Sequence, residues 1–114
     1  MRAAFDEAVK KVNDIFSMAG VDVTSGETAQ MIVAAWGTLS EQPEARKLGR
    51  TNNKEQLKRS KKFQSHATNA IFSGIAERKQ RDALLSSDRD VLKSVIGALA
   101  DLMAVAKQTG ELDN

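Results

Sequence analysis

Hydrophobic residues recur every three or four positions along most of the chain, which is the spacing of amphipathic helices. The pattern predicts a first helix over residues 3–19, which ends at Gly20, and a second helix over residues 26–40. Thr24 and Glu27 have the spacing of a capping box at the start of the second helix. We therefore expect two helices joined by a short loop in this part of the chain.

A third helix is expected to be long. It starts at about Lys54 and ends at Arg81 or Leu84, and its buried stripe begins at Phe63. The apolar content before Phe63 is limited to Leu57. The first turns of this helix are therefore expected to project past the core or to line a partner.

A short helix and a final helix complete the expected secondary structure. Pro43 is the only proline, and it suits the first turn of a short helix that runs to about Leu48. Ser87 is expected to cap the final helix, which runs to about Gln108. Short connections separate all these elements, which is typical of a helical bundle.

The predicted fold class is all-α: a compact bundle of four main helices plus a short extra helix near Pro43. The chain has 114 residues and is expected to be a single helical domain over residues 1–114. Aromatic residues make up only 4% of it, which favours helices over strands. Met31, Ala34 and Ala35 widen the apolar surface of the second helix, so we expect that helix to be buried on more than one side.

The absence of cysteine excludes disulfides and thiolate metal sites. The first residues lack the apolar run of a secretory signal, and no stretch approaches the roughly twenty apolar residues that span a bilayer. We therefore expect a cytoplasmic protein with no membrane partner.

Candidate catalytic chemistry is sparse. The sequence has no glycine-rich phosphate loop, no nucleophile elbow and no metal-ligand spacing. Asp88 and Asp90 are close carboxylates, but their position at a helix start explains them as caps. We expect a protein that is not an enzyme and that has no cofactor.

The distribution of charged residues along the chain is more informative about function than the overall composition. The stretch 44–81 holds eleven of the seventeen basic residues and three of the fifteen acidic ones, so it carries +8. The remainder carries −6, and the net charge of +2 hides this separation. A local basic field attracts polyanions whatever the net charge of the chain.

The leading functional prediction is that a basic helical segment, residues 46–62, binds nucleic acid within a larger assembly. Basic side chains would contact phosphates, Asn53 and Gln56 could reach base edges, and Phe72 could stack on a base or anchor a partner. The predicted contact residues are Arg46, Lys47, Arg50, Asn53, Lys54, Gln56, Lys58, Arg59, Lys61, Lys62 and Phe72. The alternative interpretation is a solvated helix face, with Phe72 packed near Trp36.

Residues 44–63 resemble a helix-turn-helix. Ala45 and Gly49 match the small residues of that family, and the resemblance implies a second helix from Asn53 to Phe63 that reads the major groove. It would place Asn53, Lys54, Gln56 and Lys58 on DNA. The sequence departs from the pattern six residues after the glycine, where an apolar residue is expected and Glu55 stands.

A second functional prediction is a protein–protein interaction adaptor or homo-oligomer whose basic face binds an acidic protein partner. Ala98 and Val105 lie off the main apolar stripe of the final helix. Surplus apolar surface on a small chain favours self-association. The two predictions are compatible, because a dimer doubles the basic surface.

A third possibility is a haem-binding helical bundle. Residues 63–103 resemble the middle of a globin, with His66 at the place of the distal histidine and Met103 near that of the proximal one. The family's proximal histidine is replaced by methionine here, and a haem held between His66 and Met103 is chemically compatible with a four-helix bundle. The alternative interpretation is a hydrogen-bonded histidine at the edge of the core, with methionines as core filler.

Overall fold

The computed structural model describes residues 2–42 and 54–108, and every regular element within these two ranges is a helix. The expected short helix at residues 43–48 lies outside the described residues. In chain order, the described elements are α1 (Arg2–Met18), α2 (Ser25–Ser40), α4 (Lys54–Arg59), α5 (Lys61–Gly74), α6 (Arg78–Ser86) and α7 (Arg89–Gln108). The all-helical prediction is confirmed for this part of the chain, with no strand in it.

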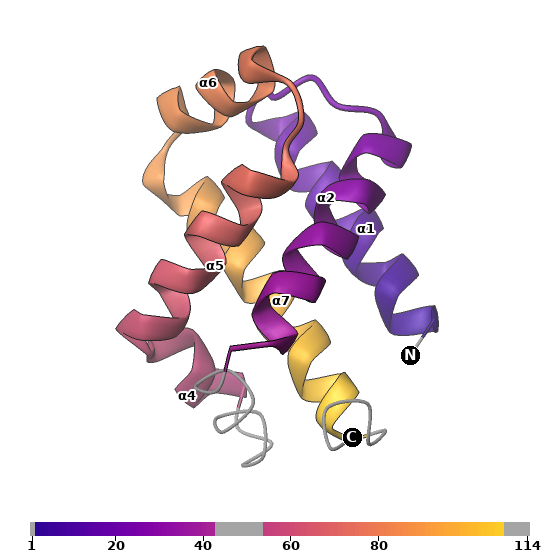
Figure 1. Ribbon diagram of the computed structural model, residues 1–114. Helices are drawn as coiled ribbons and strands as arrows, with labels where there is room; N and C mark the ends of the chain where they lie inside the picture. The colour runs from indigo at the N-terminus through magenta and orange to yellow at the C-terminus, as the bar shows by residue number, and fades with distance from the viewer. Residues whose placement is uncertain (1, 43–53, 109–114) are drawn as a thin grey trace.

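The long helices form two layers (Figure 1). α2 and α5 run antiparallel, side by side, in front of α7, while α7 packs against α1. The core between the layers is built on fully buried large side chains such as Phe16, Met31, Phe63 and Met103. α4 packs on α7 at one end of the molecule, and α6 lies at the other end. None of the described helices is both long enough and apolar enough to cross a membrane.

The predicted end of α1 at Gly20 is confirmed. Gly20 has a φ of 77°, a left-handed conformation that glycine adopts without steric cost. The backbone N–H of Val21 donates to Phe16 O at 2.9 Å, and that of Gly20 donates to Ser17 O at 3.2 Å. These two bonds form a Schellman motif, and they turn the chain so that Val21 is buried beside the core.

The predicted capping box at the start of α2 is also confirmed. The N–H of Glu27 donates to Thr24 Oγ1 at 3.1 Å, and the N–H of Thr24 donates to Glu27 Oε1 at 2.9 Å. The prediction that α2 is buried on more than one side is wrong for the single chain. Met31 and Ala35 are buried, but Ala34 is exposed and Val33 is 58% exposed.

The prediction of one long helix from Lys54 onward is wrong, because the chain bends at Ser60. On a continuous helix Leu57 and Phe63 would point about 120° apart. The bend allows both to be buried, at 1% and 0% exposure. The Oγ of Ser60 accepts a hydrogen bond from the N–H of Phe63 at 3.2 Å and so caps α5. The first turns therefore do not project past the core, since Leu57 anchors α4 to it.

A second break separates α5 from α6. Ile75 adopts an extended conformation and is buried. The Nη1 of Arg81 donates to the carbonyl oxygens of Ile75 at 2.7 Å and Ala76 at 3.0 Å. These bonds satisfy carbonyl groups that the end of a helix leaves without partners. Arg81 therefore stabilises the turn into α6.

The predicted role of Ser87 as the cap of the final helix is wrong. Its Oγ donates to Leu84 O at 2.6 Å, which closes the end of α6. The carboxylate of Asp88 instead accepts from the N–H of Asp90 at 3.1 Å, at the start of α7. The position fits Asp88 because a carboxylate is favoured at the positive end of a helix dipole.

Candidate functional site

The predicted contact residues fall into two groups. Outside the described residues lie the predicted contacts Arg46, Lys47, Arg50 and Asn53, together with the side chain of Lys54. The structure places the remaining six on α4 and α5, namely Gln56, Lys58, Arg59, Lys61, Lys62 and Phe72.

Three of these residues form a basic corner, which we define as Arg59, Lys61 and Lys62. Arg59 ends α4, and the two lysines begin α5 on the other side of the bend at Ser60. All three side chains are exposed, and Gln56 is exposed on the preceding turn. The bend therefore brings cations from two helices to one end of the molecule, at the lower left of Figure 1.

The backbone adds to the positive charge of the basic corner. The first turn of α5 contains no acidic residue, so Lys61 and Lys62 lie at the positive end of the helix dipole. Within the described part of the chain, neither Arg59 nor Lys61 forms an ion pair. The corner therefore combines side-chain and backbone charge of one sign, which favours an anion.

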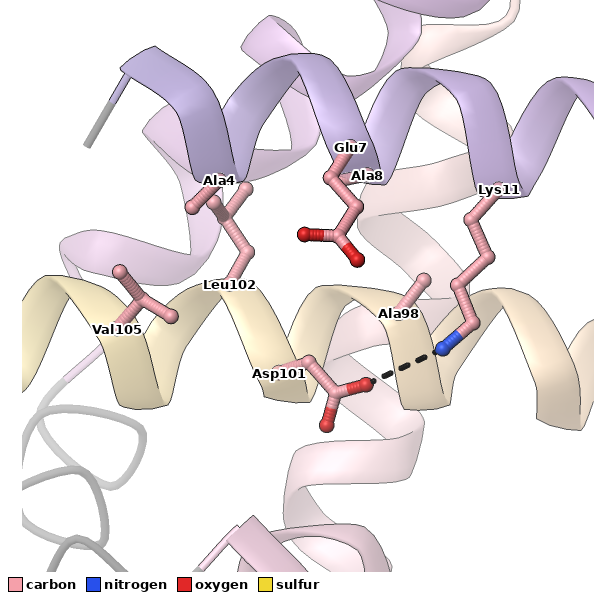
Figure 2. A pocket seen from close by; sticks show the side chains of 8 residues that line it. All are labelled: Ala4, Glu7, Ala8, Lys11, Ala98, Asp101, Leu102 and Val105. Carbon is pink, nitrogen blue, oxygen red and sulfur yellow. Dashed lines mark ion pairs between the residues drawn. The ribbon is translucent and has the colours of Figure 1, made fainter.

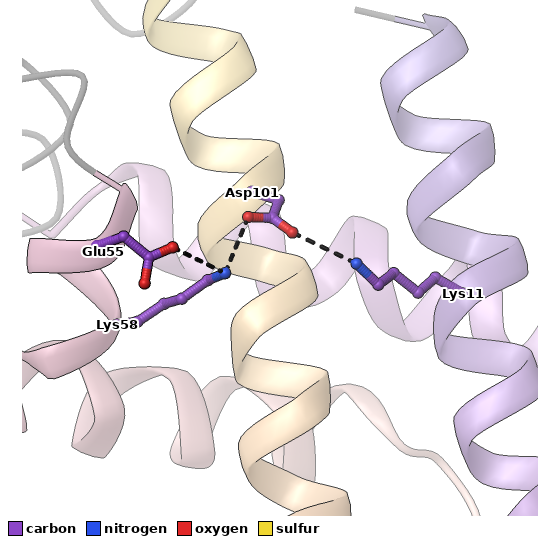
Figure 3. Close-up of polar contacts among 4 residues, drawn as sticks. All are labelled: Lys11, Glu55, Lys58 and Asp101. Carbon is purple, nitrogen blue, oxygen red and sulfur yellow. Dashed lines mark ion pairs between the residues drawn. The ribbon is translucent and has the colours of Figure 1, made fainter.

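Lys58 is placed differently from the basic corner. Its Nζ lies 3.2 Å from Asp101 Oδ1 on α7 and 3.7 Å from Glu55 Oε1 on α4 (Figure 3). The other carboxylate oxygen of Asp101 lies 3.5 Å from the Nζ of Lys11 on α1. Asp101 thus connects α1, α4 and α7, and its ion pair with Lys58 holds α4 against α7.

Phe72 does not extend freely into solvent. Its ring is half-buried and packs against the core from the outer side of α5. A half-buried ring offers only part of its surface to a ligand. This placement agrees with the alternative interpretation of Phe72 as a packing residue.

The described part of the basic stretch, residues 54–81, does not form a single surface. Its last cations lie on α6, at the end of the molecule opposite the basic corner (Figure 1). There, Arg78 Nε lies 3.7 Å from Asp82 Oδ2, and Arg81 is bonded to the α5–α6 turn. These arginines are engaged within the chain, whereas the basic corner lies at the positive end of the α5 dipole, which makes it the stronger candidate anion site.

The structure does not contain the second helix that the helix-turn-helix resemblance implies. That helix would run without interruption from Asn53 to Phe63, but the chain bends at Ser60. Leu57 is buried and Glu55 is exposed, so α4 turns its apolar side chain inward. The resemblance therefore carries no argument about DNA contacts.

A groove of about 310 Å³ runs between α1 and α7 (Figure 2). Its apolar lining includes Ala4, Leu102 and Val105, and the side chain of Glu7 extends toward α7 across it. The Lys11–Asp101 ion pair crosses the other end of the groove. Of the two residues predicted to lie off the main stripe, Ala98 is buried at 2% exposure, so it adds no surplus apolar surface, and Val105 is half-buried along this groove.

A buried polar network near α6 was not predicted from the sequence. Gln80 is buried, and its Nε2 donates to Asp22 O at 3.1 Å and to Glu27 Oε2 at 2.9 Å. The hydrogen bonds from the N–H of Thr24 and from Gln80 hold the pKa of Glu27 below its ordinary value. On α2, buried Thr28 similarly donates to Asn13 Oδ1 at 3.0 Å. The bonds of Gln80 connect α6 to the α1–α2 loop and to α2, whereas the bond of Thr28 connects α2 to α1.

The described residues contain no cluster of three His, Asp or Glu side chains that could hold a metal ion. His66 is half-buried on α5, and Met103 is fully buried on α7. Asp101 is the residue whose importance sequence reasoning missed at this end. It is the only charged residue between Lys93 and Lys107, and that isolation within an apolar helix was the available signal.

Comparison with known proteins gives this chain no relative: no family model matches it, and no significant match was found among curated proteins or solved structures.

Proposed function

We propose that the chain binds nucleic acid through the basic corner. The observation that supports this function is the meeting of Arg59, Lys61 and Lys62 at the positive end of the α5 dipole. Cations placed there destabilise their own helix slightly, and a bound phosphate would relieve that repulsion. Several phosphate contacts made together give appreciable affinity through counterion release.

The basic corner is a small site, so the proposal is for binding to the backbone and not for sequence readout. Gln56 is the only amide side chain of the predicted set that the structure shows exposed on α4. Lys58 is excluded from the contact set because Asp101 and Glu55 already neutralise it. The cations of the adjoining segment 46–54 extend the same charge in the sequence.

The test is a triple variant, Arg59→Gln with Lys61→Gln and Lys62→Gln. Binding of a labelled random-sequence duplex and a single strand is titrated with salt. Each lost phosphate contact lowers the slope of log K against log salt by about 0.9 on duplex and about 0.7 on a single strand. We expect weaker binding and a shallower slope for the variant.

The matched control removes three exposed cations elsewhere, by Lys10→Gln, Lys79→Gln and Lys93→Gln. Both variants have the same net charge, so a difference between them reports the place of the charge. Equal affinity of the two variants would contradict the proposal. Absence of binding by the unmodified chain at low salt would also contradict it and would turn the search toward an acidic protein partner.

A further inference from the structure

Charged residues are scarce in the layer that α2 and α5 form. No Asp, Glu, Lys or Arg occurs between Glu27 and Glu41, nor between Lys62 and Glu77, in a chain of which 28% is charged. These two neutral stretches make up most of α2 and α5. The two helices lie side by side in the front layer of Figure 1, so their solvent sides adjoin.

We name these solvent sides the neutral face. Its exposed side chains include Gln30, Val33, Ala34 and Thr38 on α2, and Ser65 and Asn69 on α5. Charged side chains normally cover exposed helix positions, and their depletion is a mark of the centre of protein–protein interfaces. The neutral face therefore has the composition of a contact surface, although it is exposed in the single chain.

The neutral face approaches the size of a standard interface. A helix of 16 residues, such as α2, is about 24 Å long, and two neighbouring helices are roughly 20 Å wide. These dimensions give roughly 480 Å² in projection, and the accessible area of the side chains exceeds the projected one, so the face approaches the roughly 800 Å² that a standard interface takes from each partner. Small side chains along α2 also allow a partner helix to approach closely.

The charges at one end of the neutral face indicate the partner. Glu41 follows the C-terminus of α2, and Lys61 begins the antiparallel α5, so both lie at the same end. Both side chains are exposed, and neither forms an ion pair with a described residue. Each charge has the same sign as the dipole end beside it, which is unfavourable within its own helix.

We infer that a second copy of this chain docks on the neutral face, about a two-fold axis parallel to α2 and α5. In this arrangement α2 of each copy lies antiparallel against α5 of the other, and Glu41 faces the partner's Lys61. The contact is formed twice, as a two-fold interface requires. Both basic corners then lie at the same end of the dimer, which doubles the basic surface there.

The first test is Ala34→Arg, which places a charge in the neutral face. Arginine has nearly the helix propensity of alanine, so helix content measured by circular dichroism should not change. Ala3→Arg, at an exposed position of α1, is the matched control. Sedimentation equilibrium should give twice the 12.4 kDa chain mass for the unmodified protein and for the control, but a single chain mass for Ala34→Arg. An unmodified protein that stays monomeric, or an Ala34→Arg variant that dimerises normally, would overturn the inference.

The second test exchanges the charges at the end of the face. Glu41→Lys alone places two lysines opposite each other, and Lys61→Glu alone places two glutamates there, so each should weaken the dimer about two- to fivefold. The double variant restores opposite charges and should recover the affinity of the unmodified protein. Additive losses in the double variant would overturn the two-fold arrangement. The readout is mass and not nucleic-acid affinity, so this inference can fail while the proposed function holds.

Discussion

The α2–α5 pair and the α1–α7 pair are held together by different contacts. α2 and α5 approach so closely that a Cβ on Gly74 would lie 2.9 Å from the backbone oxygen of Met31. α1 and α7 leave an open groove, which the Lys11–Asp101 ion pair bridges. Close packing leaves no place for charge between α2 and α5, whereas an ion pair crosses the open groove between α1 and α7. The two pairs therefore differ in how closely their helices pack and in whether charge joins them.

The largest effect is expected where the packing is closest. Gly74→Ala introduces a methyl group against the Met31 backbone, which cannot move without shifting α2. We expect a loss of about 1–3 kcal/mol in the free energy of unfolding, measured by urea denaturation. The matched control is Gly97→Ala on α7, where the new methyl group meets only Lys58 Cε at 3.7 Å.

The control should behave in the opposite way. Alanine is favoured over glycine inside a helix by up to about 1 kcal/mol, so Gly97→Ala should stabilise the protein. If both substitutions changed stability equally, the contrast between the two helix pairs would be lost.

A smaller effect is expected at the ion pairs of the second pair. Asp101→Asn removes the charge that holds Lys11 and Lys58, and both pairs are partly solvated. We expect a loss of roughly 1 kcal/mol, which should diminish as salt is added. Asp82→Asn, which breaks the more exposed pair with Arg78, should change stability by less than about 0.5 kcal/mol. If the loss of stability in Asp101→Asn did not depend on salt, then packing and not charge would stabilise the contacts of α7 with α1 and α4.

The smallest effect concerns pH and Glu27. Its pKa is lower in the folded chain than in the unfolded chain, so the stabilisation is complete at a pH above the pKa of the unfolded carboxyl. That stabilisation is lost as the pH falls through the folded value. Unfolding measured at neutral and acidic pH should show a difference between the unmodified chain and Glu27→Gln that fades in acid. A difference independent of pH would contradict this assignment.

Features that depend on neighbouring residues were predictable from the sequence, and features that depend on contacts between helices were not. The stop at Gly20 and the box formed by Thr24 and Glu27 depend on neighbours within five residues, and both were found where expected. The bend at Ser60 was missed because its cause is the joint burial of Leu57 and Phe63, which no helical periodicity encodes. A serine three residues before Phe63 was the available signal.

The sequence predicted the concentration of positive charge at the candidate site, but it did not predict which of the basic residues lie together in the fold. The sequence showed the concentration of basic residues and could not show that Arg78 and Arg81 lie at the far end of the molecule. It also could not show that Lys58 meets Asp101, which is 43 positions later in the chain. Side-chain pairing over such distances depends on how the helices pack.

The hydrogen bonds of Gln80 bear on the local stability of α6. Its two acceptors, on Asp22 and Glu27, lie 58 and 53 residues earlier in the chain. Gln80 and Leu84 are the buried residues of α6, and a helix held by few buried side chains opens more readily than the rest of the fold. We therefore expect the amide protons of α6 to exchange with solvent sooner than those of α5, in which Phe63, Ala67, Ala70 and Ile71 are buried.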